Sequence, residues 1–296
     1  MWKVENRQRY NRDRLRYPSD LTDDEWSLVD GLIPSAKRGG RKRDVDIREI
    51  VNGIMYVLST GCPWRYVPKD LPPRSTLHGY FQRWDYDGTW DNIRHRLYQE
   101  CREQAHRAAS PTACIIDSQS VKSAEKGGAC IDPKGYDAGK KISGKKRHIL
   151  VDTQGLLMHA VVHPANIQDR DGGILVLSTM FGLYPFLEKL FADSGYQGPK
   201  FRTAVAKALP RLSVEIVKRS DTSTGFEVLP RCWARLPKVP RARARGMADG
   251  GVERTLAWLN RCRRLAKDFE NLTRNALAFI KLASIRLMLR KLSNSK

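Results

Sequence analysis

In the first part of the chain, apolar residues recur at the three- and four-residue spacing of amphipathic α-helices. The segment Leu21–Ile33 has Thr22 near its start and Glu25 three residues later, which predicts a helix opened by a capping box. The next predicted helix ends at Gly61, shortly before a proline. Its apolar face is formed by Ile50, Val51, Ile54, Val57 and Leu58.

A third predicted helix begins near Ser75 and has a polar outer face. The residues expected on that face are Arg74, His78, Gln82 and Arg83. A fourth helix is predicted from Trp90 to His106. Short helices joined by tight turns, one with an exposed Arg/Gln/His face, predict a helix-turn-helix-like module that binds DNA. A solvated helix face explains these residues about as well.

After Ser110 the pattern changes from helical spacing to short apolar runs, which predict β-strands. Strands are expected at residues 113–116, 148–152, 156–162, 188–192 and 213–218, and helices at 171–180, 199–208, 252–267 and 272–292. This order is the layout of an RNase H-like domain. The predicted fold class is therefore α/β: an RNase H-like mixed sheet flanked by helices, preceded by an all-α helix-turn-helix-like module.

Three segments follow from these patterns. Residues 1–18 form a basic N-terminal extension, residues 19–109 the helical DNA-binding module, and residues 110–292 the catalytic domain. Apolar residues make up 41% of the chain, enough for a sizeable core.

The charge of the chain calls for a polyanionic partner. The formal net charge is +21, with 20 Lys and Arg against 16 Asp and Glu in residues 1–110 and 33 against 16 in the remainder. Nucleic acid is the usual partner of such a chain, because neutralised phosphates release counterions. A membrane is not the expected partner, since there is no apolar run of about 18 residues and no hydrophobic signal core. A cytoplasmic location is expected.

The cysteines do not indicate a metal site. None of the six lies in a C-x-x-C pair, and together with the scattered histidines they form no zinc pattern. We expect reduced thiols, most of them buried.

Three acidic residues carry the predicted chemistry. Asp117 and Asp193 each follow an apolar strand and precede Ser, and a helix crossing that sheet edge can deliver Glu253. Carboxylates are the hard oxygen ligands that Mg²⁺ and Mn²⁺ prefer. Two such ions about 4 Å apart can stabilise both the attacking and the leaving oxygen of a phosphoryl transfer. A single Asp after a strand usually only forms a turn. The evidence for a metal site is therefore that all three acids occur in this order.

The helix predicted to carry Glu253 places this residue beside an apolar stripe of Val252, Leu256 and Leu259. Basic residues surround it, of which Arg254, Arg261 and Arg264 are expected to bind phosphate. A solvated helix of mixed charge is the alternative interpretation.

A basic segment with interspersed glycines lies between the first two predicted strands. Glycine lets the backbone approach a phosphate closely, and cationic side chains neutralise it. The DNA contacts predicted in and just before this segment are Lys122, Lys140, Lys141, Lys145, Lys146 and Arg147. A flexible solubilising loop is the competing interpretation.

Long strings distributed over nearly the whole chain resemble the insertion-sequence-five type of bacterial transposases. These strings are YPSDLTDDEW (17–26), GCPWRYVP (61–68), STLHGYFQRW (75–84), IIDSQSVK (115–122), GYDAGKKISGKKRHILVDTQGLL (135–157), FADSGYQG (191–198) and VERTLAWLNRCRRLAKDFE (252–270). The resemblance implies a DDE-type enzyme with an RNase H-like fold, in which Asp117, Asp193 and Glu253 bind two Mg²⁺ or Mn²⁺ ions.

The resemblance also implies the reaction and its partners. The enzyme would hydrolyse the phosphodiester at the terminal inverted repeats of an insertion sequence and then use the freed 3′ hydroxyl to attack target DNA. The implied partners are double-stranded DNA and further copies of the chain, as a homodimer or larger assembly on paired ends. The implied setting is the bacterial cytoplasm, in association with the nucleoid.

One segment departs from the family pattern. In relatives a string like VLPRRW runs almost directly into VVERT, whereas here residues 234–251 intervene. Their composition is typical of a low-complexity linker, so we expect an exposed, poorly ordered excursion. The arginine that relatives carry four residues before the glutamate is Asp249 here, and Arg231 is its possible substitute.

The sequence is compatible with three functions. The first is an active transposase, and the second is an inactive or domesticated copy that only binds DNA. The third is an RNase H-like nuclease that cuts structured DNA or RNA without joining strands.

Overall fold

The computed structural model of the protein describes residues 10–36, 39, 43–180, 182–217 and 251–294. The chain divides into two compact units. The helical unit comprises residues 1–109, 260–266 and 278–296, and the sheet unit comprises residues 110–259 and 267–277. The segments 260–266 and 278–292, which the sequence pattern assigned to the second domain, thus pack in the helical unit.

The helices of the helical unit follow the predicted order, but the single helix predicted over 21–33 is wrong, because the chain forms a short α-helix and a separate 3-10 turn there. Its elements are α2 (Asp23–Ser27), η1 (Asp30–Leu32), α3 (Ile47–Thr60), η2 (Trp64–Tyr66), α4 (Arg74–Tyr86), α5 (Thr89–Gln104), η5 (Arg263–Leu265) and the later turns of α10 (Thr273–Ser293). The capping box is confirmed, since Thr22 Oγ1 accepts from Glu25 N and Glu25 Oε2 accepts from Thr22 N. Gly61 ends α3 in the left-handed conformation, with φ 72°.

Aromatic packing explains why the end of α10 belongs to this unit. The rings of Phe81 and Phe279 stack with centroids 4.7 Å apart. Lys281 Nζ forms ion pairs with Asp91 at 2.7 Å and Asp85 at 3.3 Å. Residues distant in sequence therefore share one core. The helix-turn-helix character of this unit stays a prediction.

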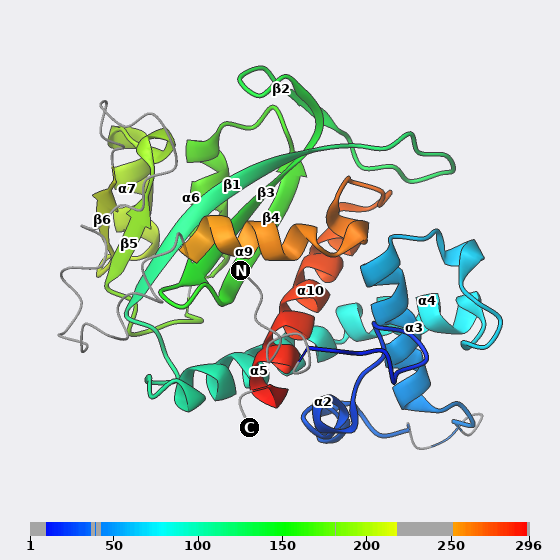
Figure 1. Cartoon of the computed structure of the whole chain (residues 1–296). Helices are drawn as coiled ribbons and strands as arrows, with labels where there is room; N and C mark the ends of the chain where they lie inside the picture. The colour runs from blue at the N-terminus through cyan, green and yellow to red at the C-terminus, as the bar shows by residue number, and fades with distance from the viewer. Residues whose placement is uncertain (1–9, 37–38, 40–42, 181, 218–250, 295–296) are drawn as a thin grey trace. The chain divides into compact units, whose positions relative to one another are not determined.

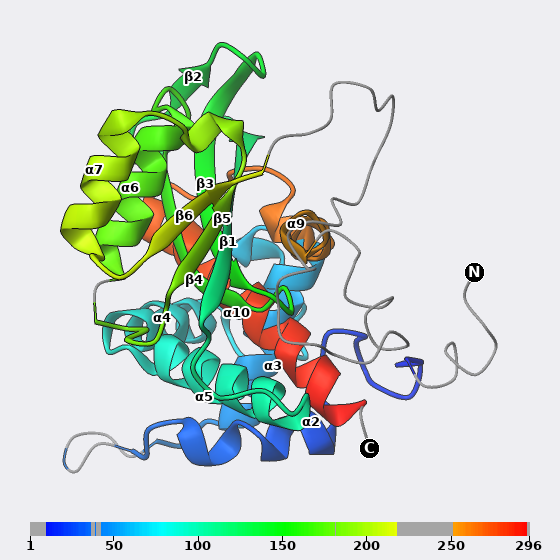
Figure 2. The same ribbon diagram turned by 90° about the vertical axis from the view of Figure 1, so that its left-hand side faces the viewer.

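The sheet unit is built on a six-stranded mixed sheet (Figures 1 and 2). Its strands are β1 (Ala113–Lys122), β2 (Gly135–Asp137), β3 (Ile142–Asp152), β4 (Leu157–Pro164), β5 (Lys189–Ala192) and β6 (Ser213–Ile216). The order is β2-β3-β1-β5-β6, with β4 also paired to β3. Strands β1 to β4 pair antiparallel, whereas β5 runs parallel to β1 and β6 parallel to β5. The predicted mixed α/β architecture is confirmed.

Helices lie on both faces of this sheet. In both ribbon views α6 (Asp169–Thr179) and α7 (Pro199–Ala208) cover one face, and α9 (Gly251–Asn260) lies on the opposite face. Thr255 Oγ1 on α9 donates to Gly155 O, at 2.6 Å, in the turn that joins β3 and β4. This bond holds α9 against the sheet. The strands predicted at 148–152 and 156–162 are confirmed and pair antiparallel as β3 and β4.

Two strands extend well beyond the predicted apolar runs. β1 continues past Asp117 to Lys122, and β3 begins at Ile142. The pattern of apolar residues does not predict the extension of β1, because it contains Ser118 and Ser120, which are polar although they are buried. At Gly144 of β3 an added Cβ would lie only 2.0 Å from Val121 O, so the strands approach too closely there for any side chain.

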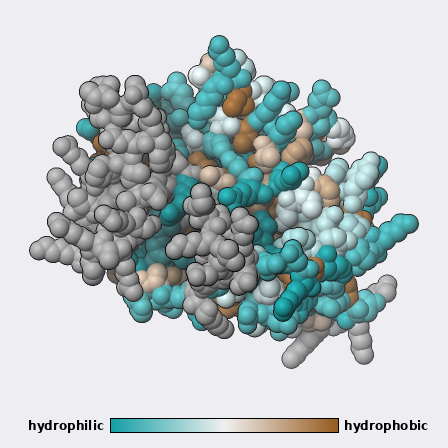
Figure 3. Space-filling model, viewed as in Figure 1, coloured by the Kyte–Doolittle hydropathy of each residue, from teal (hydrophilic) through white to brown (hydrophobic). Residues whose placement is uncertain are grey.

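The part of the surface seen in Figure 3 is mainly hydrophilic, and its hydrophobic patches are small and scattered. Among the described residues, no helix combines the length and the apolar character needed to cross a bilayer.

Candidate active site

Two of the three predicted acids lie side by side on the sheet. The parallel strands β1 and β5 pair with Ile115 beside Phe191. Asp117 and Asp193 follow two residues later in their chains, just beyond the last paired residues, and both are close enough to Tyr196 to raise its pKa. Asp117 is half-buried and Asp193 is exposed. The expectation that Asp117 ends its strand is wrong, because the pairing with β5 ends at Ile115 while β1 continues along β3 to Lys122.

Backbone amides orient both carboxylates. Ser118 N donates to Asp117 Oδ1 at 2.6 Å. Asp193 caps the short helix η3 (Ser194–Tyr196), and its Oδ1 accepts from Gly195 N at 2.8 Å. These bonds restrict the side-chain torsions and hold the two carboxylates in defined directions.

The face to which Asp117 points follows from its neighbour. Ser118 Oγ donates to Asp169 Oδ1 at 2.9 Å, and Asp169 begins α6, so Ser118 faces α6. Successive side chains of a strand alternate between faces, and Asp117 therefore points to the face on which α9 lies. Glu253 belongs to α9, but its side chain lies outside the described residues.

Asp169 is a further acid close to this pair that sequence reasoning missed. An added Cβ on Gly195 would meet Asp193 Oδ1 at 3.0 Å and Asp169 Oδ2 at 3.6 Å, so both carboxylates approach one point. Burial would raise the pKa of Asp169, but hydrogen bonds from Lys146 and Ser118 outweigh it, and the pKa is lowered. The only sequence signal is an Asp at the predicted start of a helix, which is too common to single it out.

A buried phenol and two buried imidazoles lie beside these acids. Burial, followed by the charges of Asp117, Asp169 and Asp193, holds the pKa of Tyr196 well above its usual value. His148 is fully buried and stacks on His163, with Nε2 of His163 2.8 Å from Nδ1 of His148. Burial and the neighbouring His163 lower the pKa of His148 to about 3, so its imidazole is neutral at pH 7.

Three predicted phosphate contacts lie inside the sheet unit and not on an open loop. Lys145, Lys146 and Arg147 are all buried within β3. Lys145 Nζ donates to Thr273 Oγ1, and Lys146 Nζ forms an ion pair with Asp169 at 2.8 Å. The solvent-facing placement expected for these cations is therefore wrong. They are buried because acceptors from distant segments satisfy them.

Two more predicted contacts are engaged within the helical unit. His78 is half-buried, with its ring 5.1 Å from Trp64, and burial lowers its pKa. Arg264 is buried, donates to Cys62 O at 3.0 Å and lies over the ring of Phe279. The burial of Arg264 makes its expected availability to phosphate wrong, whereas His78 keeps part of its side chain accessible.

The other predicted contacts keep accessible side chains. Gln82 is half-buried, and the exposed residues are Arg74, Arg83, Lys122, Lys140, Lys141, Arg254 and Arg261. Over the part of the chain that is described, no three His, Cys, Asp or Glu residues form a group that could hold a metal ion. This statement does not extend to the set Asp117, Asp193 and Glu253, because the side chain of Glu253 lies outside the described residues.

Comparisons with known proteins point in one direction. Residues 108–288 match the family described as "Transposase DDE domain", and residues 21–94 match the family described as "Putative transposase of IS4/5 family". The chain is 30% identical over 109 residues to an uncharacterized 16.2 kDa protein of insertion element IS402 from Burkholderia cepacia. This alignment covers 34% of this chain and 73% of that protein.

A second relative is the uncharacterized protein y4sN of Sinorhizobium fredii, 25% identical over 73 residues, or 25% of this chain and 58% of that protein. No solved structure matches the chain.

Proposed function

Because this chain belongs to the DDE-domain transposase family, we propose that it cleaves DNA at the ends of an insertion sequence and joins those ends to target DNA. The family match implies an RNase H-like fold for the sheet unit. The observation that supports the activity most directly is that Asp117 and Asp193, both within the matched region, lie near one another on or just after the neighbouring parallel strands β1 and β5. A homodimer or larger assembly on paired DNA ends is part of this proposal.

Transposases of this family use divalent metal ions, and we propose that Asp117, Asp193 and Glu253 hold two of them, Mg²⁺ or Mn²⁺. The donor set fits, because carboxylate oxygens are the ligands that these hard cations prefer. When bound, the ions would neutralise charge at the attacking and leaving oxygens. The chain itself supplies positioning, through the amides of Ser118 and Gly195 that orient both aspartates. Exposed Lys140 and Lys141 supply positive charge for the DNA.

The test uses the full chain and a duplex that carries the terminal inverted repeat from the DNA flanking its gene. Asp117→Asn and Asp193→Asn should abolish nicking in Mg²⁺ or Mn²⁺ and leave the gel shift intact, because Asn keeps the side-chain shape but loses the charge. Asp171→Asn is the matched control, since this carboxylate lies on α6 in an exposed pair with Lys200. Nicking that survives Asp117→Asn would refute the assignment.

A copy that binds DNA without cutting it is the second candidate function. The observation that favours it is residues 234–251, which interrupt the family pattern just before Glu253. Residues 234–250 lie outside the described residues. Binding by the wild-type chain without nicking in either metal would establish this alternative. A strand-transfer assay separates the transposase from a simple nuclease, since only the transposase joins the cut end to target DNA.

A further inference from the structure

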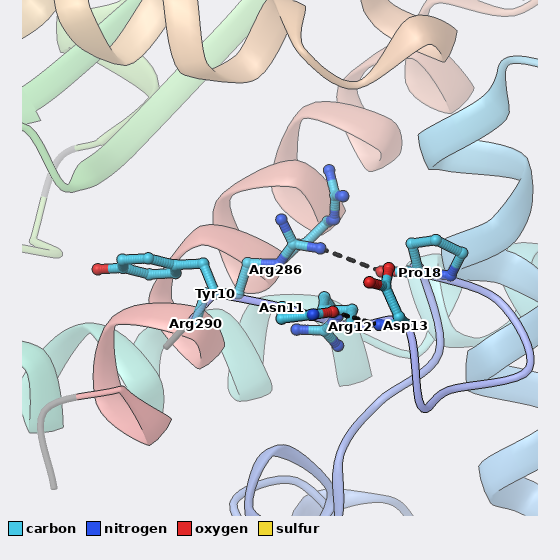
Figure 4. Close-up of a pocket in the computed structure, with 7 residues that line it drawn as sticks. All are labelled: Tyr10, Asn11, Arg12, Asp13, Pro18, Arg286 and Arg290. Atoms are coloured by element: carbon cyan, nitrogen blue, oxygen red, sulfur yellow. Dashed lines mark hydrogen bonds between the residues drawn. The ribbon is translucent and has the colours of Figure 1, made fainter. Parts of the chain in front are cut away.

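A solvent-open pocket of about 500 Å³ lies in the helical unit, between the N-terminal segment and α10 (Figure 4). Its lining residues are Tyr10, Asn11, Arg12, Asp13, Pro18, Arg286 and Arg290. Figure 4 shows the side chains of Arg286 and Arg290, from successive turns of α10, extending toward Arg12 and Pro18. Three guanidinium groups therefore converge on one hollow, which we call the arginine pocket.

The charges of this pocket are only partly neutralised from within the described chain. Arg12 is neutralised, because its guanidinium pairs with both carboxylate oxygens of Glu25 at 2.6 and 2.8 Å. Arg290 donates to a neutral acceptor, Pro18 O at 3.3 Å, and Arg286 Nη1 contacts Cys262 Sγ at 3.3 Å. Neither Arg286 nor Arg290 forms an ion pair with a carboxylate of the described residues, although Asp13 lines the same pocket.

One further observation indicates that an anion would complete this arrangement. Burial, followed by the charges of Arg286 and Arg12, lowers the pKa of Arg290 to about 10, and Glu25 offsets only part of that effect. Like charges held together cost free energy, which an anion in the pocket would recover.

We propose that the arginine pocket binds a phosphodiester group of DNA. A guanidinium presents paired donors that match two phosphate oxygens, which makes arginine better suited than lysine to this role. That the bound phosphate group belongs to DNA rests on the proposed function. That the pocket binds a phosphate group does not, since inorganic phosphate offers the same oxygens. The structural alternative is that Arg286 and Arg290 serve only to anchor the N-terminal segment, through hydrogen bonds such as that of Arg290 with Pro18.

The first experiment measures the salt dependence of duplex binding by the full chain, using a short fluorescent duplex. The double variant Arg286→Gln/Arg290→Gln should lower the slope of log K against log salt by about 0.9 for each phosphate that it no longer neutralises. The control, Arg65→Gln/Arg96→Gln, removes the same charge at two exposed positions of the helical unit. A slope change no larger than that of the control would refute the proposal. The lysine double variant, which keeps the charge, should restore part of the slope.

The second experiment measures thermal unfolding without DNA, at constant ionic strength, in chloride and in inorganic phosphate. Phosphate should raise the melting temperature of the wild type more than that of the glutamine variant. In chloride the glutamine variant should melt at the same temperature as the wild type or higher, because it removes repulsion. A lower melting temperature with an unchanged salt slope would establish the anchoring role and overturn the proposal.

The sources of failure are separable. Phosphate stabilisation of the wild type without any difference in the DNA salt slope would identify a site for free phosphate and refute the DNA assignment. If the wild type binds no duplex at all, the proposed function fails together with the DNA assignment. If the wild type binds the duplex and the variant shows the same salt slope, only the proposal for the arginine pocket is refuted.

Discussion

Replacing Asp169 by Asn tests whether the buried network behind the two aspartates stabilises the sheet unit. Asp169 accepts from Lys146 Nζ at 2.8 Å and from Ser118 Oγ at 2.9 Å. The side chain of Lys146 is 6% exposed, so its ammonium cannot turn to water when this partner is removed. Asn keeps the shape of Asp169 but removes its charge.

The expected cost follows from what Lys146 retains. A hydrogen bond to a charged group contributes roughly 1.5–3 kcal/mol, and breaking a buried pair costs about 3–5 kcal/mol. Lys146 still donates to Ile167 O at 2.9 Å and lies 3.5 Å from Asp137, which compensates in part. We therefore expect the Asn variant to lose about 2 kcal/mol of unfolding free energy, or about 4–8 °C in melting temperature.

The assay compares urea and thermal unfolding of the wild type, Asp169→Asn and Asp171→Asn. Asp171 is the control, because its exposed pair with Lys200 should contribute at most about 1 kcal/mol. The pKa of Asp169 is lowered in the folded state, so its stabilisation is present above the unfolded value of about 3.9 and disappears as the pH falls through the folded value. Equal losses for the two variants at neutral pH, or a difference that grows in acid, would refute the reasoning.

Three other perturbations have defined outcomes. The pKa of His148 is about 3 in the folded state and about 6.5 in the unfolded state. The free energy of unfolding should therefore fall as the pH drops below 6.5, by up to about 1.4 kcal/mol per pH unit. In His148→Gln the urea midpoint should depend less on pH than in the wild type. Gly144→Ala should cost about 3 kcal/mol or more in urea unfolding because its Cβ would clash with Val121 O, whereas Gly79→Ala, in open space on α4, should stabilise by about 0.5–1 kcal/mol. Deleting residues 234–251 should leave the melting curve unchanged and preserve or raise nicking, because loop length changes the closure entropy only slowly. If the deletion variant is unfolded, the segment is required for folding.

Local signals in the sequence were sufficient for some element boundaries, but not for the ends of β1 and β3 or for the helix predicted over 252–267, which ends at Asn260. Thr22 with Glu25, and Gly61 in its left-handed conformation, act within a few residues of themselves, and the structure shows them as predicted. The helix α7 covers the predicted residues 199–208. The order of strands and helices predicted the mixed sheet, and it also placed Asp117 and Asp193 on or directly after strands that prove to be neighbours.

Tertiary structure decided which polar side chains are buried and which residues meet. The consecutive cations Lys145 to Arg147 have the composition of a DNA-binding loop, yet acceptors such as Thr273 and Asp169 let them lie inside a strand. The same holds for Arg286 and Arg290, which meet Arg12 only after α10 packs against the N-terminal segment. The environment of a charge depends on partners far away in the chain, and no local pattern of residues encodes those contacts.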